Sequence, residues 1–173
     1  MESPNHIIKK KLLTIVYIVK NEQILLGMKK RGFGVGNWNG FGGKVQAGES
    51  IEEAARRELQ EESSLVVDSL QKVGVVDQEF VGDPVILEIH IYKADSYHGE
   101  PTESEEMKPQ WFNVDEIPFD KMWLDDQYWF PYMLKGSCFY AYYLFEGFHK
   151  ILKEKLLEVT SEEVRSHLEK WRR

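Results

Sequence analysis

The stretch GFGGKVQAGESIEEAARRELQEESSL, residues 40–65, decides the fold of this 173-residue chain. It begins with a glycine-rich segment of the kind that approaches phosphate, and it continues as a strongly acidic segment. Its apolar spacing predicts a helix from Ser50 to Ser64, with Ser50 and Glu53 forming a capping box at the N-terminus. Carboxylates repel phosphate, so their position directly after such a loop needs a physical explanation.

The glycine-rich segment fails both common phosphate-binding patterns. A P-loop requires Ser or Thr after Gly43-Lys44, where this chain has Val45. A dinucleotide-binding fingerprint that starts at Gly32 meets Asn37 in place of its last glycine, and no parallel βαβ unit frames it. Phosphate binding here would therefore need another mechanism.

The glutamates of the predicted helix lie on one face. Glu58 and Glu62 are four residues apart and Glu61 is three from Glu58, so their like charges repel one another. A divalent cation removes this conflict, because Mg²⁺ prefers oxygen ligands and completes its shell with water and substrate phosphates. From the helix alone, an acidic face in contact with solvent remains the alternative.

The wider spacing resembles the Nudix box, G-x5-E-x7-R-E-U-x-E-E-x-G-U, in which U is apolar. The matching residues are Gly43, Glu49, Arg57, Glu58, Leu59, Glu61, Glu62 and Leu65. Ser64 stands where the pattern has glycine, just past the expected helix end, where a left-handed residue is easily formed by glycine. Other stretches, such as LLGMKKRGFGVGNWNGFGGKVQAGE and IPFDKMW, resemble vertebrate MutT-type Nudix hydrolases, and the resemblance covers about residues 12–159.

This resemblance implies an α/β Nudix fold with a mixed β-sheet sandwiched between helices. Residues 1–159 would form the hydrolase domain, and residues 160–173 would form an additional C-terminal helix with Val164, Leu168 and Trp171 on one face. The residue patterns also predict a loop at 29–43, a helical turn at 114–117 and a helix at 126–134, and they leave 151–159 open between strand and helix. Strands are predicted at 11–20, 23–28, 66–76, 79–81, 85–94, 110–112 and 139–145.

The resemblance also implies an activity. Oxidised purine nucleoside triphosphates, such as 8-oxo-dGTP and 2-hydroxy-dATP, would be hydrolysed to nucleoside monophosphate and pyrophosphate, which cleanses the nucleotide pool. The alternatives are another Nudix substrate, namely a methylated purine triphosphate, a dinucleoside polyphosphate or ADP-ribose, and a nucleotide-binding Nudix module without turnover.

The same resemblance assigns the residues of a metal site and its chemistry. The metal would be Mg²⁺, with Mn²⁺ as a substitute, and Glu62 would activate the attacking water, with Glu61 and Glu106 as rivals for that role. Arg57 would brace the helix and the loop. The expected metal ligands are the main-chain oxygen of Gly42 and the side chains of Glu58, Glu61, Glu62 and Glu106.

The expected substrate site joins the glycine-rich segment to residues far along the chain. Gln78 and Leu87 depart from the family pattern, which has an aromatic residue and a methionine at these positions. Asp125 and Asp126 would share one proton and so meet either a donor or an acceptor on a purine, or Asp126 would only cap the following helix. The predicted substrate-binding residues are Thr14, Lys29, Phe33, Asn39, Phe41, Gly42, Gly43, Lys44, Gln78, Leu87, Trp123, Asp125, Asp126 and Trp129.

Composition narrows the class of partners. A net charge of -7 argues against binding a nucleic-acid polymer. The single cysteine, Cys138, excludes an internal disulfide, and the chain has no apolar run of membrane length. We expect a cytoplasmic monomer, with the nucleus or mitochondrion as other compartments and with the C-terminal helix as a possible surface for association.

Overall fold

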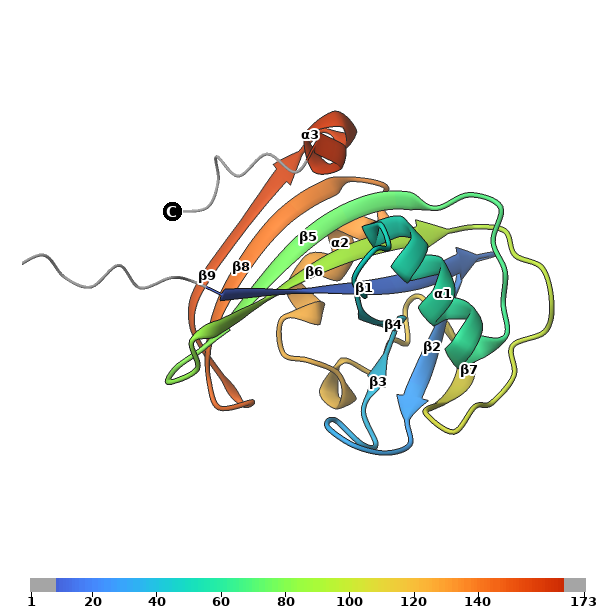
Figure 1. Ribbon diagram of the computed structural model, residues 1–173, viewed down its shortest axis with the longest axis horizontal. Helices are drawn as coiled ribbons and strands as arrows, with labels where there is room; N and C mark the ends of the chain where they lie inside the picture. The colour runs from blue at the N-terminus through green and yellow to red at the C-terminus, as the bar shows by residue number, and fades with distance from the viewer. Residues whose placement is uncertain (1–8, 167–173) are drawn as a thin grey trace, which may run out of the picture.

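The computed structural model describes residues 9–166, which form a mixed β-sheet with helices packed on both faces (Figure 1). The strands are β1 (Lys9–Lys20), β2 (Gln23–Lys29), β3 (Trp38–Asn39), β4 (Phe41–Lys44), β5 (Gln71–Phe80), β6 (Val85–Ala94), β7 (Met107–Asn113), β8 (Cys138–Glu146) and β9 (Lys150–Val159). The helices are α1 (Ile51–Ser63), the 3-10 helix η1 (Phe119–Lys121), α2 (Asp126–Leu134) and α3 (Ser161–Ser166). Within this part of the chain, no helix is long and apolar enough to cross a membrane.

The sheet divides at β1. One edge of β1 pairs in parallel with β6, while its other edge pairs antiparallel with β4 and then with β2, which in turn pairs with β3 and β7. Beyond β6 the sheet continues through β5, β8 and β9, with β5 and β8 parallel. The turn between β1 and β2 uses Asn21 and Glu22 with φ of 54° and 62°, the left-handed pair of a tight hairpin.

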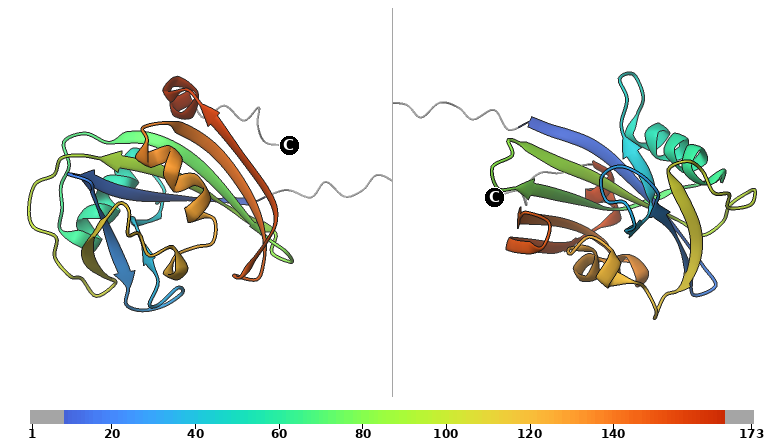
Figure 2. Two further views of the ribbon diagram at one scale, coloured as in Figure 1. Left: turned by 180° about the vertical axis from the view of Figure 1, so that it is seen from behind. Right: turned by 90° about the horizontal axis from the view of Figure 1, so that it is seen from below.

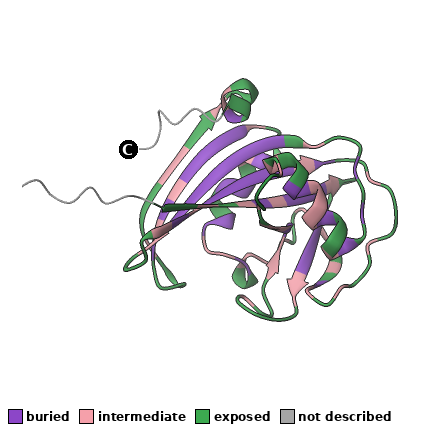
Figure 3. Cartoon of the chain, viewed as in Figure 1, coloured by how far each residue is buried: buried purple, intermediate pink, exposed green. Residues whose placement is uncertain are grey.

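Alternation along the strands sends side chains to two cores on opposite faces of the sheet. On one face Val16 and Ile18 of β1 pack with Leu59 of α1. On the other face Tyr17 packs with Trp129 and the rest of the apolar side of α2. Figure 2 shows α1 and α2 on these two faces, and buried residues fill the central strands between them (Figure 3).

The predicted elements are largely confirmed, with corrections where long-range pairing decides. Strand β6 and helix α2 have the predicted bounds, and residues 150–159 form a strand that pairs with β8. The strands expected at 66–76 and 79–81 are one strand, β5, and the expected loop at 29–43 contains β3 and the start of β4. The helical turn expected at 114–117 is wrong, because the helical residues follow Pro118 as η1.

Helix α3 begins with a second capping box, formed by Thr160 and Glu163. The N–H of Glu163 donates to Oγ1 of Thr160 at 3.1 Å, and the N–H of Thr160 donates to Oε1 of Glu163 at 3.4 Å. Val164 is fully buried against Val75 and Tyr140 of the sheet, so the first turns of this helix pack on their own chain. Leu168 and Trp171 lie outside the described residues, and the division into domain and extension at residue 160 stays a prediction.

Candidate active site

Helix α1 presents its acidic side because its ends and its apolar side are fixed. Oγ of Ser50 accepts a hydrogen bond from the N–H of Glu53 at 3.1 Å, as predicted for the N-cap. Ala55 and Leu59 are fully buried against the sheet. The chain leaves the helix through Ser64, whose φ of 66° is left-handed. The glutamates on the other side therefore lie along the surface of the helix.

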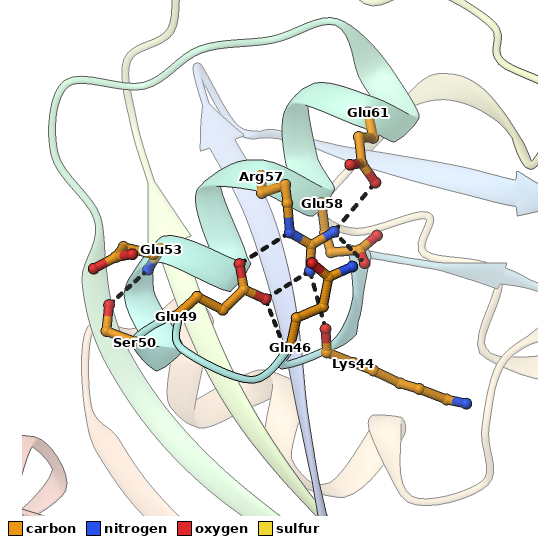
Figure 4. A network of polar contacts seen from close by, with 8 residues as sticks. All are labelled: Lys44, Gln46, Glu49, Ser50, Glu53, Arg57, Glu58 and Glu61. Atoms are coloured by element: carbon orange, nitrogen blue, oxygen red, sulfur yellow. Dashed lines mark hydrogen bonds and ion pairs between the residues drawn. The ribbon is translucent and has the colours of Figure 1, made fainter.

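Arg57 joins this helix to the preceding loop (Figure 4). Its guanidinium donates to both carboxylate oxygens of Glu49, at 3.0 and 2.8 Å, and to the carbonyl oxygen of Lys44 at 3.1 Å. It also donates to Oε1 of Glu58 at 2.9 Å and to Oε2 of Glu61 at 3.3 Å. The hydrogen bonds from Arg57 lower the pKa of Glu49 to about 2. Arg57 is thus a brace that orients two of the acids.

An open acidic cleft of about 540 Å³ lies beside the last turns of α1. Its lining comes from α1, from the segment before β7 and from the segment after β2. The lining residues are Arg31, Glu58, Glu61, Glu62, Ser104, Glu105 and Glu106. Burial, together with the charges of Glu58 and Glu106, raises the pKa of Glu62 to about 8. Burial also raises the pKa of Glu58, although Arg57 opposes this.

Glu106 closes the cleft from a distant part of the chain. Nε of Arg31 donates to Oε1 of Glu106 at 2.6 Å, and this hydrogen bond holds the pKa of Glu106 below its usual range. The carbonyl oxygen of Glu106 accepts a hydrogen bond from the N–H of Lys30 at 2.8 Å. The segment after β2 therefore places Glu106 opposite the acids of α1.

Gly42 and Gly43 form a strip of bare backbone next to this cleft. The N–H of Gly42 donates to Oε1 of Glu62 at 2.8 Å. A Cβ at Gly42 would lie 1.7 Å from the carbonyl oxygen of Thr14, and one at Gly43 would lie 2.7 Å from Oε1 of Glu58. At Gly42 only glycine fits, because the backbone of β1 approaches so closely, whereas a side chain at Gly43 would displace the carboxylate of Glu58.

A second, more enclosed cavity of about 220 Å³ lies on the other side of the diglycine. Strands β1, β4, β5 and β6 form much of its wall, and the loop before α2 and the start of α2 complete it. The residues that line it are Leu13, Thr14, Ile15, Lys29, Phe33, Asn39, Gly40, Gly42, Gly43, Val76, Gln78, Leu87, Ile89, Ile91, Trp123, Asp125, Asp126 and Trp129.

Two carboxylates are buried in this cavity. Oδ1 of Asp125 accepts from Nε2 of Gln78 at 3.1 Å, and Oδ2 accepts from Nε1 of Trp129 at 3.0 Å. Oδ2 of Asp126 is buried without a hydrogen-bond partner. Burial raises the pKa of Asp125 to about 6 and raises that of Asp126 well above its ordinary value. Asp125, rather than Asp126, is the N-cap residue of α2, and its side chain makes no capping hydrogen bond. Capping by Asp126 is therefore wrong.

Asn39 is fixed by the residues around it. Its Oδ1 accepts hydrogen bonds from the hydroxyl of Tyr17 at 3.1 Å and from the N–H of Gly40 at 2.8 Å. Both contacts orient the amide so that Nδ2 is the group left to donate to a ligand. Tyr17 is fully buried behind it.

Aromatic rings gather at the edge of the cavity. The ring of Phe33 lies 5.6 Å from that of Trp123 and 5.0 Å from that of Phe148, measured between centroids. Phe80 also contacts Trp123, at 6.2 Å. Phe33 and Phe148 are 60% and 50% exposed, so these rings combine stacking surface with access from solvent.

The chain is similar to known proteins over most of its length. The NUDIX domain family model matches residues 10–133 of the chain. The chain belongs to the Nudix family. It is 58% identical over 149 residues to the oxidized purine nucleoside triphosphate hydrolase of Danio rerio, covering 86% of this chain and 96% of that protein. It is 55% identical over 151 residues to the protein of the same name from Mus musculus, covering 87% and 97%.

Solved structures of the Nudix family share the fold. The crystal structure of the MutT protein from Bacillus halodurans superposes with a TM-score of 0.76 at 27% identity, covering 84% of this chain and 97% of that one. A MutT Nudix hydrolase from Burkholderia pseudomallei gives a TM-score of 0.59 at 29% identity, covering 64% and 88%.

Nudix enzymes typically depend on a divalent metal ion, and the acids of the cleft fit one by their chemistry. They offer oxygen donors only, which hard cations prefer. A cation would also offset the crowding of charge that raises the pKa of Glu62. Within residues 9–166, no three acidic, histidine or cysteine side chains already stand in a ligating arrangement. In this structure, two of the carboxylates have other partners instead: Glu106 accepts a hydrogen bond from Arg31, and Glu62 accepts one from the N–H of Gly42.

The structure brings the predicted substrate-binding residues of this Nudix protein to one cavity, with two exceptions. Phe41 is fully buried in the core under α1, with Leu59 and Met107, because alternation along β4 turns its ring to that face. Lys44 is exposed at the end of β4, and its carbonyl oxygen accepts a hydrogen bond from Arg57. Neither residue lines the cavity.

Sequence reasoning missed three residues that shape the Nudix site. Tyr17 orients Asn39, Arg31 holds Glu106, and Phe148 braces the rings at the cavity edge. Tyr17 lies in the strand predicted at 11–20, but nothing in that pattern indicated its contact with Asn39. Arg31 and Glu106 are 75 residues apart, and Phe148 lies in the hairpin between β8 and β9, so no local pattern indicated either contact.

Proposed function

We propose that this Nudix protein is an enzyme that hydrolyses oxidised purine nucleoside triphosphates to nucleoside monophosphate and pyrophosphate, and so cleanses the nucleotide pool. The observation that carries the proposal is the diglycine between the two cavities. Gly42 and Gly43 line the enclosed cavity, while Glu62 and Glu58 contact the same glycines from the acidic side. A base in the enclosed cavity would therefore place its phosphates at the acids.

Two further findings support this substrate class. The relatives from Danio rerio and Mus musculus, which match most of this chain, are named oxidized purine nucleoside triphosphate hydrolases. The cavity also presents Asn39 and two buried aspartates, and such groups recognise a purine edge by donating and accepting hydrogen bonds. A purely apolar cavity would lack this discrimination.

The roles of the residues follow from their places. Glu58, Glu61, Glu62, Glu106 and the main-chain oxygen of Gly42 would hold Mg²⁺, or Mn²⁺ in its place. The metal, when bound, offsets phosphate charge and lowers the pKa of water. Glu62 is the base that takes a proton from the attacking water. Lys29 lies near enough to Glu62 to lower its pKa, and it adds positive charge for the phosphates. Arg57 positions the acids of α1 without touching substrate.

The base would be held by the remaining residues of the enclosed cavity. Trp123 and Phe33 offer ring surfaces at its edge, and Asn39 with the aspartate pair reads the purine. Both cavities are built from one chain, so we propose that the enzyme acts as a monomer.

The test is a substrate panel with Mg²⁺ that measures pyrophosphate and nucleoside monophosphate release. The panel contains 8-oxo-dGTP, 2-hydroxy-dATP, dGTP and ADP-ribose. We expect kcat/KM for at least one oxidised substrate to exceed that for dGTP by at least ~10-fold, because buried polar groups discriminate strongly between purine edges. Equal rates for dGTP, or turnover of ADP-ribose alone, would contradict the proposal.

A further inference from the structure

Gln78 places an amide in the wall of the enclosed cavity, where the family resemblance had led us to expect an aromatic ring. It lies on β5, opposite Leu87 of β6 in register, and it is 3% exposed. Its Nε2 donates to Oδ1 of Asp125 at 3.1 Å. The amide is therefore tied to the acid pair rather than turned to solvent.

We propose that Gln78 is a specificity-determining residue, which holds Asp125 as a hydrogen-bond acceptor and leaves Asp126 to carry the donor proton. The pocket then binds a purine edge with one arrangement of hydrogen-bond donors and acceptors well, and it binds an edge with the reversed arrangement poorly. This inference rests on the proposed function, because it concerns which oxidised purine the same cavity selects.

The contacts of Asp125 favour its ionised form. Both oxygens receive hydrogen bonds from side chains, one from Gln78 and one from the indole N–H of Trp129 at 3.0 Å. Hydrogen bonds donated to a carboxylate stabilise the charged state. A protonated Asp125 would require Gln78 to turn its amide and present Oε1, whereas an ionised Asp125 keeps both contacts as they stand and still has lone pairs for a base.

The surroundings of Asp126 favour its neutral form. Its Oδ2 is buried without a partner, and the charge of Asp125 acts on it. Among the described residues, the titratable groups that face the pair are the phenols of Tyr17 on β1 and Tyr143 on β8, while Lys29 of β2 lines the same cavity. Burial raises the pKa of both phenols, so neither supplies charge to ionise Asp126. A proton shared by the pair therefore resides on Asp126.

A fixed proton has a consequence for substrate choice. An acid pair that exchanges its proton serves two purine edges of opposite hydrogen-bond order. With Asp125 held ionised, only the edge that donates to Asp125 and accepts from Asp126 finds partners for all its groups. The other edge leaves a buried donor or acceptor unpaired, which lowers its transition-state binding.

The test replaces Gln78 by methionine, which keeps the length of the side chain and removes the N–H donor. For the wild type we expect kcat/KM for 8-oxo-dGTP and 2-hydroxy-dATP to differ by at least ~10-fold. In Gln78→Met we expect the factor by which kcat/KM differs between the two substrates to be at least ~5-fold smaller than in the wild type. Loss of the donor raises the pKa of Asp125, so the acid limb of kcat/KM for the preferred substrate should move to higher pH.

Gln71→Met is the matched control, because it makes the same change at an exposed position of β5 that does not line the cavity. It leaves Gln78 and both partners of Asp125 in place, so the substrate ratio and the acid limb should stay as in the wild type. A ratio near one in the wild type, or an unchanged ratio and acid limb in Gln78→Met, overturns the inference.

Carboxyl-carbon NMR titration of the protein without substrate separates this inference from the proposed function. We expect Gln78→Met to raise the pKa of Asp125, whatever nucleotide the enzyme uses. If the wild type hydrolyses neither oxidised purine, the proposed function is wrong and the specificity role falls with it. An unchanged pKa of Asp125 in the variant would by itself remove the link between Gln78 and the acid pair.

Discussion

Ser64 offers a direct test of how the Nudix box ends its helix. The family pattern has glycine at this position, and the structure gives Ser64 a φ of 66° and a ψ of 13°. The left-handed conformation costs a residue with a Cβ about 1–2 kcal/mol. Its side chain is exposed, and among residues 9–166 its hydroxyl makes no hydrogen bond that would offset this cost. We therefore expect Ser64→Gly to stabilise the protein.

The magnitude follows from two opposing terms. Glycine removes the strain of about 1–2 kcal/mol from the folded protein. Its greater conformational freedom stabilises the unfolded chain and so reduces this gain by about 0.4–1 kcal/mol. The net gain is about 0.8 kcal/mol in the free energy of unfolding, the middle of a range of about 0–1.6 kcal/mol. For a chain of 173 residues, this corresponds to a rise in Tm of about 1.5–3 °C.

The assay is calorimetric unfolding of Ser64→Gly beside Ser64→Ala. The alanine variant keeps a Cβ and removes only the hydroxyl, so its stability should stay within about 0.5 kcal/mol of the wild type. The turnover number should change little in either variant, because the glutamates precede Ser64 in an intact helix. A glycine variant no more stable than the alanine variant would refute the strain argument.

Three other variants test the remaining contacts. We expect Glu62→Gln to lower kcat by at least ~100-fold with no loss of Tm, since it removes a base and a ligand charge but little volume; near-normal kcat would exclude this role. Burial and the charge of Asp125 raise the pKa of Asp126 well above its ordinary value in the folded protein, whereas in the unfolded chain it ionises above pH about 4. Wild-type stability therefore falls as pH rises above that value. Asp126→Asn lacks this loss, so its advantage in Tm should grow from pH 4 to 7, and a constant difference would contradict the neutral state. Val164→Ala should lower the free energy of unfolding by ~1.5 kcal/mol without changing kcat, because two buried methyl groups are lost; an unchanged Tm would mean that α3 does not pack as described.

Local signals made helix α1 predictable. The cap at Ser50 and the spacing of Ala55 and Leu59 lie within a few residues of one another, and each fixes one feature of the helix. The brace by Arg57 also acts over a short distance along the chain. The glutamates of α1 could therefore be placed from local sequence, whereas Glu106 was expected only from the family resemblance and Glu105 was not expected at all.

Contacts between distant strands set what the sequence could not predict. β1 pairs with β2, β4 and β6, and its choice of partners depends on the whole sheet rather than on its own residues. This is why β3 and β4 were expected to be loop. The hydrogen bond from Gln78 to Asp125 joins residues 47 apart, so the sequence showed an unusual residue without showing its partner.

The two cavities explain why acids directly follow a glycine-rich segment in this chain. Gly42 and Gly43 pair with β1 on one side and meet Glu58 and Glu62 on the other, with no side chain between. The glycines therefore do not wrap a phosphate, as a P-loop does. They bring a cavity with hydrogen-bonding groups and a cluster of carboxylates to opposite sides of one strand. The carboxylates and the phosphates would repel each other, and a cation between them would remove this repulsion and let a nucleotide span both sites.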